Sequence, residues 1–520
     1  MSVWRPEPVV ASAARSPLAK AAALERAGDL PSAFAAYETA LAARPEDPEI
    51  LAGLASLAGR MELADVAARL WEEVRRLDPP RLEAVDGQAR ALRDLGRFED
   101  AVALLREALI RNPQEARLWN SLGVTLTQDS HAAEAIIFFD EALRLDRRLA
   151  AAIYNRGNAR FDLGDLEGAA ADYRQAHRVA RNPAYLAAIA FAEATVALAR
   201  GDLARAWDAY EARLSRHRTG ALGFDLPGRR WSPGARLAGR RLLIVGEQGL
   251  GDELMFANLL PDVLDALGPQ GRLSLAVEPR LVQLFARSFP TAEVVAHATA
   301  RAGPGFRRSA PGLERPREMD LWAPMGSLPR EFRRSIARFP AAAGYLAPHP
   351  VLAGRWLRWL GDGPPAVGLS WRSGKVAGDR RRQYPPRGLW EPLLRTPGVR
   401  FVNVQYGDCA EELAAFRAET GAEILEPPGL DLREDIDGLA ALLSALDLTV
   451  CVANATAALA GAIGAEAAVL GAPTAWPRLG TETLPWYPHA RVLTAPAFGD
   501  WGPAMDAARG LVAELAGARS

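Results

Sequence analysis

The chain has 520 residues, which is more than one hydrophobic core usually organises, so we expect two or three domains. An apolar fraction of 49% and a charged fraction of 24% are typical of folded proteins and exclude a mostly disordered chain. The 63 acidic and 62 basic residues balance, which excludes a protein built around a broad basic surface for nucleic acid or membranes.

The two cysteines, Cys409 and Cys451, are too few for a disulfide framework and lack the spacing of zinc ligands. We therefore expect a cytoplasmic protein. The opening MSVWRPEPVV does not have the layout of a signal peptide. Residues 448–465 carry no charge, but Asn454 and Thr456 interrupt them, so we expect a strand, a polar turn and a buried helix, not a membrane span.

The first 200 residues repeat with a period of 34. Small residues recur at Ala33, Ala67, Ala101, Ala135 and Ala169. Large residues share that spacing at Tyr37, Trp71, Leu105, Phe139 and Tyr173. Alanine lets paired helices approach closely and the large side chain fills the gap between neighbours. The pattern resembles the tetratricopeptide repeat, with about five units over residues 17–179 and a degenerate helix pair over residues 185–214.

A repeat array of this kind forms a solenoid with a concave groove, which commonly binds peptide or protein segments. Asn120 and Asn155 lie in the first helices of their repeats, where their amides could bond the backbone of a bound segment. The alternative is that both are ordinary solvated helix positions.

From about residue 240 the pattern changes to alternating strands and helices. Residues 240–267 predict a buried strand, a glycine loop and an amphipathic helix, and residues 272–278 the next strand. Residues 301–317 are rich in Gly, Pro and Arg and predict a loop. A second series starts at residues 365–374 and continues at 399–407. Two tandem open α/β domains imply a ligand site in the cleft between them.

The first glycine loop, GEQGLGDE at residues 246–253, has neither the GxGxxG spacing of a dinucleotide site nor a following GK[ST]. It carries three carboxylates, Glu247, Asp252 and Glu253, which would repel a phosphate at a helix N-terminus. These acids fit a general base, or recognition of hydroxyl groups. Helix capping by Asp252 is the equally weighted alternative.

The second domain has a loop of opposite character. Asn454 and Thr456 stand at the start of a helix with no acid nearby, which predicts an anion site. Basic side chains from the loop after residue 371 could converge there: Arg372, Lys375, Arg380, Arg381 and Arg382. The alternative is a solvated basic loop. The six histidines are scattered, so we expect no metal site and a donor phosphate held without metal.

Several runs follow one another in an order that resembles a known family: RRWSPGARLAGRRLLIVGEQGLGDELMF, MDLWAPMGSLPR, GLSWRSG, FVNVQYGD, LLSALDLTVCVANATAALAGAIG and PWYPHARV. Together they resemble the bacterial tetratricopeptide glycosyltransferases whose catalytic half is similar to ADP-heptose transferases. The resemblance implies an all-α solenoid followed by an α/β GT-B fold of two Rossmann-like domains. The predicted division is an N-terminal extension (1–16), the solenoid (17–218), an acceptor-side domain (219–360) and a nucleotide-sugar domain (361–520).

The resemblance also implies roles for residues. Asp252 matches the acid of the family's GD loop, which makes it the general base, with Glu247 and Glu253 as the other candidates. The turn at residues 454–458 matches the helix that binds the donor phosphate. The implied substrate-binding residues are Gln248, Gly249, Gly251, Ser370, Arg372, Lys375, Arg380, Gln405, Tyr406, Asn454, Ala455 and Thr456. No cofactor is expected beyond the nucleotide-sugar co-substrate.

The wording WRSG, QYGD and AALAG is shared with a subset that resembles flagellin glycosyltransferases. For that subset the implied donor is a CMP-linked nonulosonic acid, and the implied partner is flagellin, recruited by the repeats. Ala453 and Ala458 stand where the commoner family pattern has Asp and His, which leaves open a repeat scaffold with an inactive transferase half. Transfer to a lipopolysaccharide glycan is a third interpretation, against which the repeat groove argues. We also expect a homodimer through the end of the array near Trp4.

Overall fold

The computed structural model describes residues 17–218, 220–302, 305–313, 319–341, 344–374 and 382–518. The chain separates into two compact units, Met1–Pro113 and Gln114–Ser520. The predicted N-terminal extension, and with it the proposed dimer contact near Trp4, lies outside the described residues.

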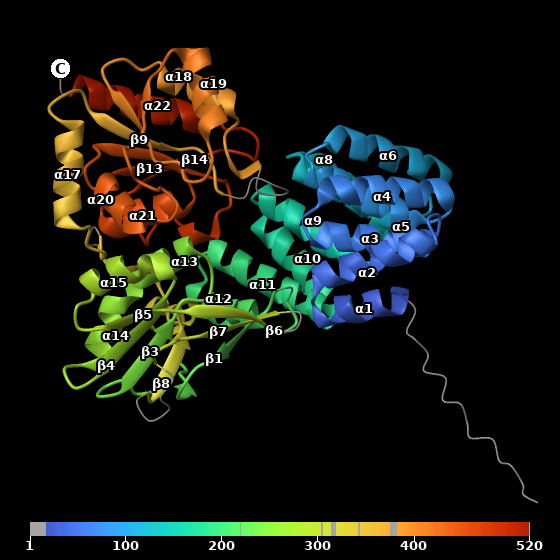
Figure 1. Cartoon of the computed structure of the whole chain (residues 1–520), viewed down its shortest axis with the longest axis horizontal. Helices are drawn as coiled ribbons and strands as arrows, with labels where there is room; N and C mark the ends of the chain where they lie inside the picture. Colours follow the sequence, from blue (N-terminus) through green and yellow to red (C-terminus); the bar gives the residue numbers. More distant parts are fainter. Residues whose placement is uncertain are drawn as a thin grey trace, which may run out of the picture. The chain divides into compact units, whose positions relative to one another are not determined.

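The described part of the first unit consists of three helix pairs (Figure 1). Its helices are α1 (Pro17–Ala27), α2 (Leu30–Ala43), α3 (Pro48–Arg60), α4 (Ala64–Leu77), α5 (Leu82–Asp94) and α6 (Phe98–Arg111). Short polar turns start several of them. Asp47, for example, precedes Pro48 and its side chain accepts from the N–H groups of Glu49 and Ile50, so it satisfies the orphan donors of the first turn of α3.

The second unit begins with three further helix pairs and a short 3₁₀ turn. They are α7 (Ala116–Gln128), α8 (Ala132–Leu145), α9 (Ala150–Asp162), α10 (Leu166–Val179), α11 (Pro183–Ala199), α12 (Leu203–Tyr210) and η1 (Glu211–Leu214). Together with α1–α6, the described part of the chain therefore holds twelve helices before the first strand, which confirms the predicted repeat solenoid.

Close packing of glycine against aromatic rings recurs in the repeats. A Cβ atom at Gly157 would lie 2.7 Å from Tyr173 Cε1, and one at Gly123 would lie 2.6 Å from Phe139 Cε1. Both aromatics belong to the series with the 34-residue spacing. The period in the sequence therefore reflects a contact in which a ring lies directly on the backbone of the facing helix.

The first α/β region is built on a five-stranded sheet, β2-β8-β3-β4-β5, in which every pair of neighbours is parallel. Its strands are β2 (Arg229–Arg230), β3 (Arg241–Val245), β4 (Arg272–Val277), β5 (Glu293–Ala296) and β8 (Leu321–Pro324). Its helices are α13 (Leu250–Phe256), η2 (Ala257–Leu259), α14 (Leu260–Leu267), η3 (Pro279–Leu281), α15 (Val282–Ser288), η5 (Met325–Ser327), α16 (Pro329–Phe332) and η6 (Ile336–Arg338). Strand β3 lies centrally, so the loop that follows it opens at the carboxyl edge of the sheet.

A smaller sheet, β1-β7-β6, adjoins this region and differs from the sequence-based expectation. Its strands are β1 (Leu222–Asp225), β6 (Ala298–Ala302) and β7 (Gly305–Ser309). Strands β6 and β7 pair antiparallel, whereas the composition of residues 301–317 predicts a loop. The glycines and arginines of this stretch conceal a hairpin because its strands are short and largely exposed, and so carry little hydrophobic pattern.

The second α/β region has a six-stranded parallel sheet, β11-β10-β9-β12-β13-β14. Its strands are β9 (Ala366–Ser370), β10 (Arg400–Asn403), β11 (Ile424–Leu425), β12 (Leu448–Val452), β13 (Ala467–Gly471) and β14 (Arg491–Thr494). Its helices, with the preceding α17 (Pro350–Leu360), are η8 (Arg387–Trp390), α18 (Glu391–Leu394), α19 (Ala410–Thr420), α20 (Ile436–Leu443), α21 (Ala455–Ile463), η9 (Trp476–Arg478) and α22 (Gly502–Gly517). Strands β9, β12 and β13 are buried throughout, as expected when helices cover both faces of a parallel sheet.

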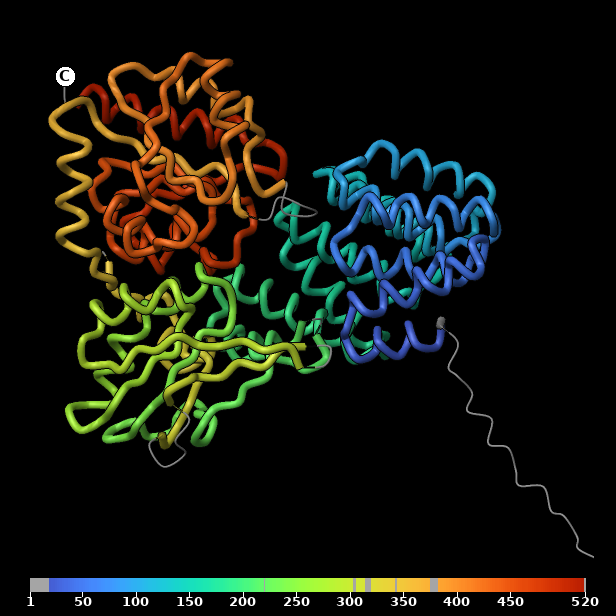
Figure 2. Tube along the Cα trace, in the orientation of Figure 1, coloured from blue at the N-terminus to red at the C-terminus, as the bar shows by residue number. Residues whose placement is uncertain are grey.

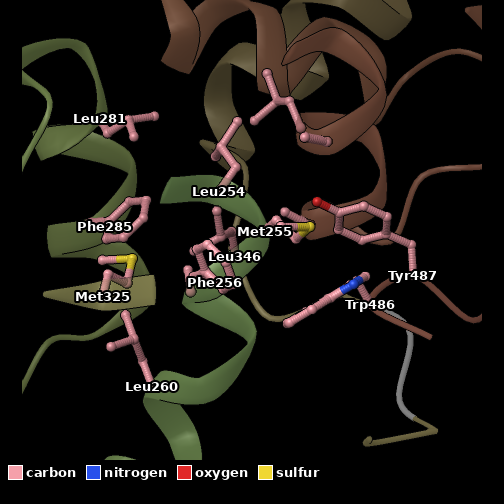
Figure 3. Packing of buried hydrophobic residues seen from close by; sticks show 14 of the residues in the cluster. Leu254, Met255, Phe256, Leu260, Leu281, Phe285, Met325, Leu346, Trp486 and Tyr487 are labelled. Atoms are coloured by element: carbon pink, nitrogen blue, oxygen red, sulfur yellow. The ribbon is translucent and has the colours of Figure 1, made fainter. Parts of the chain in front are cut away.

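The two α/β regions share a hydrophobic core. The tube in Figure 2 follows the chain from α12 through the first sheet (green to yellow) and into the second (orange to red). Met255 and Phe256 of α13 lie beside Trp486 and Tyr487, which belong to the segment between β13 and β14 (Figure 3). These parallel sheets with flanking helices confirm the α/β part of the prediction.

Candidate active site

The first loop, residues 246–253, connects β3 to α13 and carries the three predicted carboxylates. The structure separates their environments. Glu247 and Glu253 are each only 2% exposed at the side chain, and each is held by buried partners. Asp252 lines a pocket.

Glu247 forms a buried ion pair with Arg213 of η1, with 2.8 Å between Nη2 and Oε1. Its carboxylate also accepts from the backbone N–H of Gly326 at 3.0 Å. Burial raises the pKa of Glu247, while Arg213 and the Gly326 N–H act in the opposite direction. A carboxylate enclosed in this way anchors the loop and has no path to a substrate hydroxyl.

Glu253 is fixed from the other side of the loop. It accepts from the backbone N–H of Glu278 at 2.8 Å, and His297 Nε2 lies 3.1 Å from its Oε1. Arg308 of β7 donates to the carbonyl of Gly246. Two of the three predicted catalytic candidates are therefore structural in their contacts, because their oxygens already have protein partners.

Asp252 occupies the first turn of α13, and its Oδ2 accepts from the backbone N–H of Gly249 at 3.0 Å. The predicted capping contact therefore exists. A carboxylate has two oxygens and several lone pairs, so capping is compatible with accepting a proton. Of the three acids in this loop, Asp252 is the one that lines the pocket.

The second loop joins β12 to α21 and is uncharged. Asn454 caps α21: its Oδ1 accepts from the Ala457 N–H at 3.2 Å. Its amide nitrogen donates to Ser370 Oγ at 2.9 Å and to the Arg372 carbonyl at 3.0 Å. Asn454 therefore joins the start of α21 to the end of β9, which fixes the orientation of the helix N-terminus.

The two loops touch. A Cβ atom on Gly251 would lie 3.6 Å from Ala455 Cα and 3.8 Å from Ala458 Cβ, and α13 packs along α21. The small Ala458 thus lies in a close helix–helix contact. The Asp252 turn and the Asn454 turn face the same space as a result.

That space is a pocket of about 910 Å³ within the second unit. The first loop contributes Gly249, Gly251 and Asp252, and the second α/β region contributes Tyr406, Asn454, Ala455, Thr474, Trp476 and Tyr487. Helices α7, α9 and α11 contribute Gln128, Tyr154, Asn155, Asn158, Phe161, Asp162 and Phe191. The repeats and both α/β regions therefore form one ligand-sized site.

The repeat side of the pocket presents amides and aromatic rings. Asn155 Nδ2 donates to Asn120 Oδ1 at 2.9 Å, which fixes the two predicted groove residues together. Asn155 lines the pocket and Asn120 supports it from behind. Tyr173 donates to Asn158 Oδ1 at 2.7 Å. These amides can hydrogen-bond a polypeptide backbone without contributing net charge.

One ion pair joins two parts of the pocket lining, the repeats and the segment after β9. Arg382 donates to Asp162 of α9 at 2.5 Å and to the carbonyl of Thr127 at 3.3 Å, and its guanidinium lies over the Phe498 ring at 4.4 Å. The segment after β9 is thus attached to the repeats by a charge pair whose members are both about 8% exposed.

The sequence predicts that basic side chains converge on the second loop, and for Arg372 this prediction is wrong. Its guanidinium binds the carboxylate of Glu412 on α19, at 2.6 to 2.9 Å, and the carbonyl of Asp408. Hydrogen bonds to Glu412 raise the pKa of Arg372. The positive charge is neutralised there and does not reach the pocket. The predicted Lys375, Arg380 and Arg381 lie outside the described residues.

Several predicted substrate-binding residues support the site from within the protein. Gln405 is buried, and its Oε1 accepts from the backbone N–H groups of Trp371 and Arg372, each at 2.9 Å. Ser370 is also buried and holds Asn454, whereas Gln248 contacts Tyr210. Thr456 is 1% exposed and lies behind the pocket surface. Tyr406, by contrast, lines the pocket and accepts from the Gly374 N–H.

Aromatic residues that the sequence did not single out form a packed cluster, from which Trp476 lines the pocket. Trp207 of α12 lies 6.2 Å from Trp476 and 6.0 Å from Trp486, measured between ring centroids. Tyr210 lies 5.5 Å from Trp476, and Phe256 lies 5.5 Å from Trp486. Trp486 belongs to the run PWYPHARV that the sequence analysis singled out, but its contact with Trp207 of α12 is visible only in the fold.

Within the described ranges, no group of three or more His, Cys, Asp or Glu side chains is placed to share a metal ion. None of the described helices has the length and apolarity needed to cross a bilayer. Cys409 and Cys451 are both buried and are not joined to each other.

Comparison with known proteins identifies the tetratricopeptide repeat at residues 87–152 and 150–183. Protein FlbA of Caulobacter vibrioides (strain ATCC 19089 / CIP 103742 / CB 15) is 46% identical over 488 residues, with 93% of this chain and 82% of that protein covered. A thermophilic repeat protein of Thermus thermophilus, TTC0263, is 23% identical with a TM-score of 0.30, and 34% of this chain and 96% of that one are covered. Pseudomonas aeruginosa pilF is 17% identical with a TM-score of 0.29, covering 38% and 86%. The FlbA match spans repeats and α/β regions alike.

Proposed function

The chain belongs to the family of Protein FlbA, and we propose that it is a protein O-glycosyltransferase of the GT-B fold. In this proposal it is inverting and metal-independent, and it transfers a sugar from a nucleotide-sugar to a Ser or Thr hydroxyl. The observation that carries the proposal is the shared pocket, onto which an accessible carboxylate, the capped N-terminus of a helix and an amide-bearing repeat wall all open.

In the proposed reaction, Asp252 accepts the proton of the acceptor hydroxyl. The hydroxyl oxygen forms a bond to the anomeric carbon, and the bond from that carbon to the donor phosphate oxygen breaks with its electron pair leaving on the phosphate. The start of α21, fixed by Asn454, supports binding of that anionic leaving group through its N–H groups and helix dipole. Base and leaving-group site thus belong to different loops that line one pocket, so both can act on the same anomeric carbon.

The repeats support an acceptor that is a protein. Asn155 and Asn158 belong to the same pocket as Asp252, so a segment held along α9 would bring its side chains to the first loop. We propose flagellin as the acceptor and a CMP-linked nonulosonic acid as the donor. Both choices rest on the resemblance of the WRSG, QYGD and AALAG motifs to flagellin glycosyltransferases.

The test is transfer in a defined mixture. The purified protein is incubated with flagellin and, separately, with CMP-, UDP-, GDP- and ADP-linked sugars, and the intact acceptor is weighed by mass spectrometry. We expect a mass increase of one or more sugar residues with the CMP-linked donor. No mass change with any donor would contradict the proposal.

A second candidate function is a repeat scaffold whose transferase half no longer reacts. The capping role of Asp252 and the alanines at 453 and 458 favour it. Thermal unfolding in the presence of CMP, UDP, GDP and ADP separates the two, because a ligand that binds the folded state raises the transition temperature. A transferase is stabilised by its nucleotide, whereas a scaffold without a nucleotide site is stabilised by none.

A further inference from the structure

The last turn of the repeat region lies against the loop that carries Asp252. Arg213 of η1 has only 4% of its side chain exposed, and its Nη2 and Nε lie 2.8 and 3.1 Å from Glu247 Oε1. Gly326 at the start of the segment after β8 donates its N–H to the same carboxylate. Glu247 is therefore held from the repeats on one side and from the sheet on the other.

Each of the three nitrogen atoms of the Arg213 guanidinium donates a hydrogen bond. Nη1 donates to Glu211 at 2.7 Å, and Nη2 also donates to Ser327 Oγ at 2.9 Å. Ser327 in turn donates to Glu211 at 2.7 Å. This arrangement uses the planar fork of an arginine, which a single lysine ammonium cannot reproduce.

Tyr210, the last residue of α12, holds the next residue of the loop. Its hydroxyl lies 3.1 Å from Gln248 Nε2, and its ring lies 4.8 Å beneath the Arg213 guanidinium. The repeats thus anchor the two consecutive residues Glu247 and Gln248. Glu253 is anchored at the far end, so the segment 249–252 that contains Asp252 is suspended between two fixed points.

From this geometry we infer that Arg213 and Tyr210 are positioning residues for Asp252, so the end of the repeat region is a structural part of the transfer site. The inference rests on the proposed function for the role of Asp252. The repeats would then both bind the acceptor and hold the Asp252 loop in place.

The first measurement does not depend on activity. Hydrogen–deuterium exchange of the full-length protein is followed in peptides that cover residues 246–253, for the wild type, Arg213→Lys and Tyr210→Phe. We expect exchange at least about tenfold faster in Arg213→Lys and a smaller increase in Tyr210→Phe, because each anchor restrains local opening. Tyr210→Phe keeps the buried ring, so it reports on the loop even if Arg213→Lys fails to fold.

The matched control is Arg156→Lys. Arg156 is a half-buried repeat arginine that also bridges two carboxylates, those of Asp140 and Asp172, but it does not contact the first loop. Exchange at residues 246–253 should stay at the wild-type rate in this variant. Equal acceleration in the control, or none in either test variant, would overturn the inference.

The second measurement is steady-state transfer. We expect kcat to fall about 10- to 100-fold in Arg213→Lys while the donor KM stays within about twofold, because misplacing a catalytic group slows the reacting step. Adding Arg213→Lys to Asp252→Asn should cost nothing further. Full additivity of the two changes would contradict action through Asp252. If the wild type transfers nothing while the exchange difference is present, the anchoring stands and the proposed function falls.

Discussion

The two loops that meet in the pocket come from the same kind of strand–loop–helix unit, yet one is rich in acidic residues and the other is uncharged. The first, residues 246–253, has three carboxylates and places two of them inside the protein. The second, residues 453–458, has none and orders its helix with the neutral Asn454. Residue type alone therefore does not identify a catalytic acid.

What distinguishes the acids is their surroundings. Glu247 meets Arg213, and Glu253 meets His297 and a backbone N–H, whereas Asp252 caps its own helix and lines the pocket. A loop built this way is held rigidly by its two buried acids and presents the third at the pocket. The uncharged second loop leaves its helix N-terminus without competing negative charge of its own.

The largest expected effect comes from removing the one acid of the first loop that lines the pocket. Asp252→Asn should lower kcat by about 10²- to 10⁴-fold, because an amide of the same shape cannot accept the proton. The asparagine oxygen can still cap Gly249 N–H, so thermal unfolding and nucleotide affinity should remain near the wild-type values. Steady-state transfer with calorimetric nucleotide binding measures both. Wild-type turnover would refute the assignment of the base.

Giving the second loop an acid should erase the difference between the loops. Asn454→Asp keeps an oxygen cap on α21 but places a negative charge where we propose the donor phosphate binds. We expect nucleotide affinity to fall about tenfold or more, since like charges at close range repel. Asn454→Ser is the control, because serine caps without charge and should lose less affinity. Equal losses in both variants would place the phosphate elsewhere.

Removing a buried acid should affect stability more than turnover. Glu253→Gln weakens its contacts with His297 and the Glu278 N–H, and we expect a loss of about 1–3 kcal/mol in the free energy of unfolding. Turnover per folded molecule should fall less than in Asp252→Asn. Urea unfolding and steady-state transfer measure the two effects. A kinetic loss as large as that of Asp252→Asn would make Glu253 a catalytic candidate again.

The smallest effect concerns pH. Burial acts to raise the pKa of Glu211, but Arg213 and the Ser327 hydroxyl outweigh it, so the pKa of Glu211 is lowered in the folded protein. A lowered pKa contributes stability that is fully present above the unfolded value of about 4.3 and is lost as pH falls through the folded value. Glu211→Gln should therefore flatten the decline in unfolding free energy below about pH 4.3. The exposed Glu482→Gln should leave that decline unchanged, and a similar flattening there would argue against the linkage.

The sequence predicts the repeats well because a solenoid is a local structure. The spacing of Tyr173 and Phe139 reflects contacts between neighbouring helices, so the period alone locates them. The α/β regions are predictable because each strand–loop–helix unit is also local, with a buried strand followed by a glycine turn. The β6–β7 hairpin escapes prediction because its exposed strands lack a hydrophobic pattern.

The site is harder to predict because partners far away in the sequence determine which of its charged side chains reach the pocket. Arg213 precedes Glu247 by 34 residues, and His297 follows Glu253 by 44. Nothing near Arg372 in the chain indicates that Glu412, 40 residues away, neutralises it. The sequence therefore names the acids and the basic loop, and tertiary pairing decides which of them reach the pocket.

The most direct test of the division between the two loops is a crystal structure with a bound nucleotide, with CMP as the first choice. We expect the phosphate at the start of α21, within hydrogen-bonding distance of its first backbone N–H groups and not bound by the 246–253 loop. A nucleotide bound outside this pocket, or a phosphate held at the 246–253 loop, would contradict it.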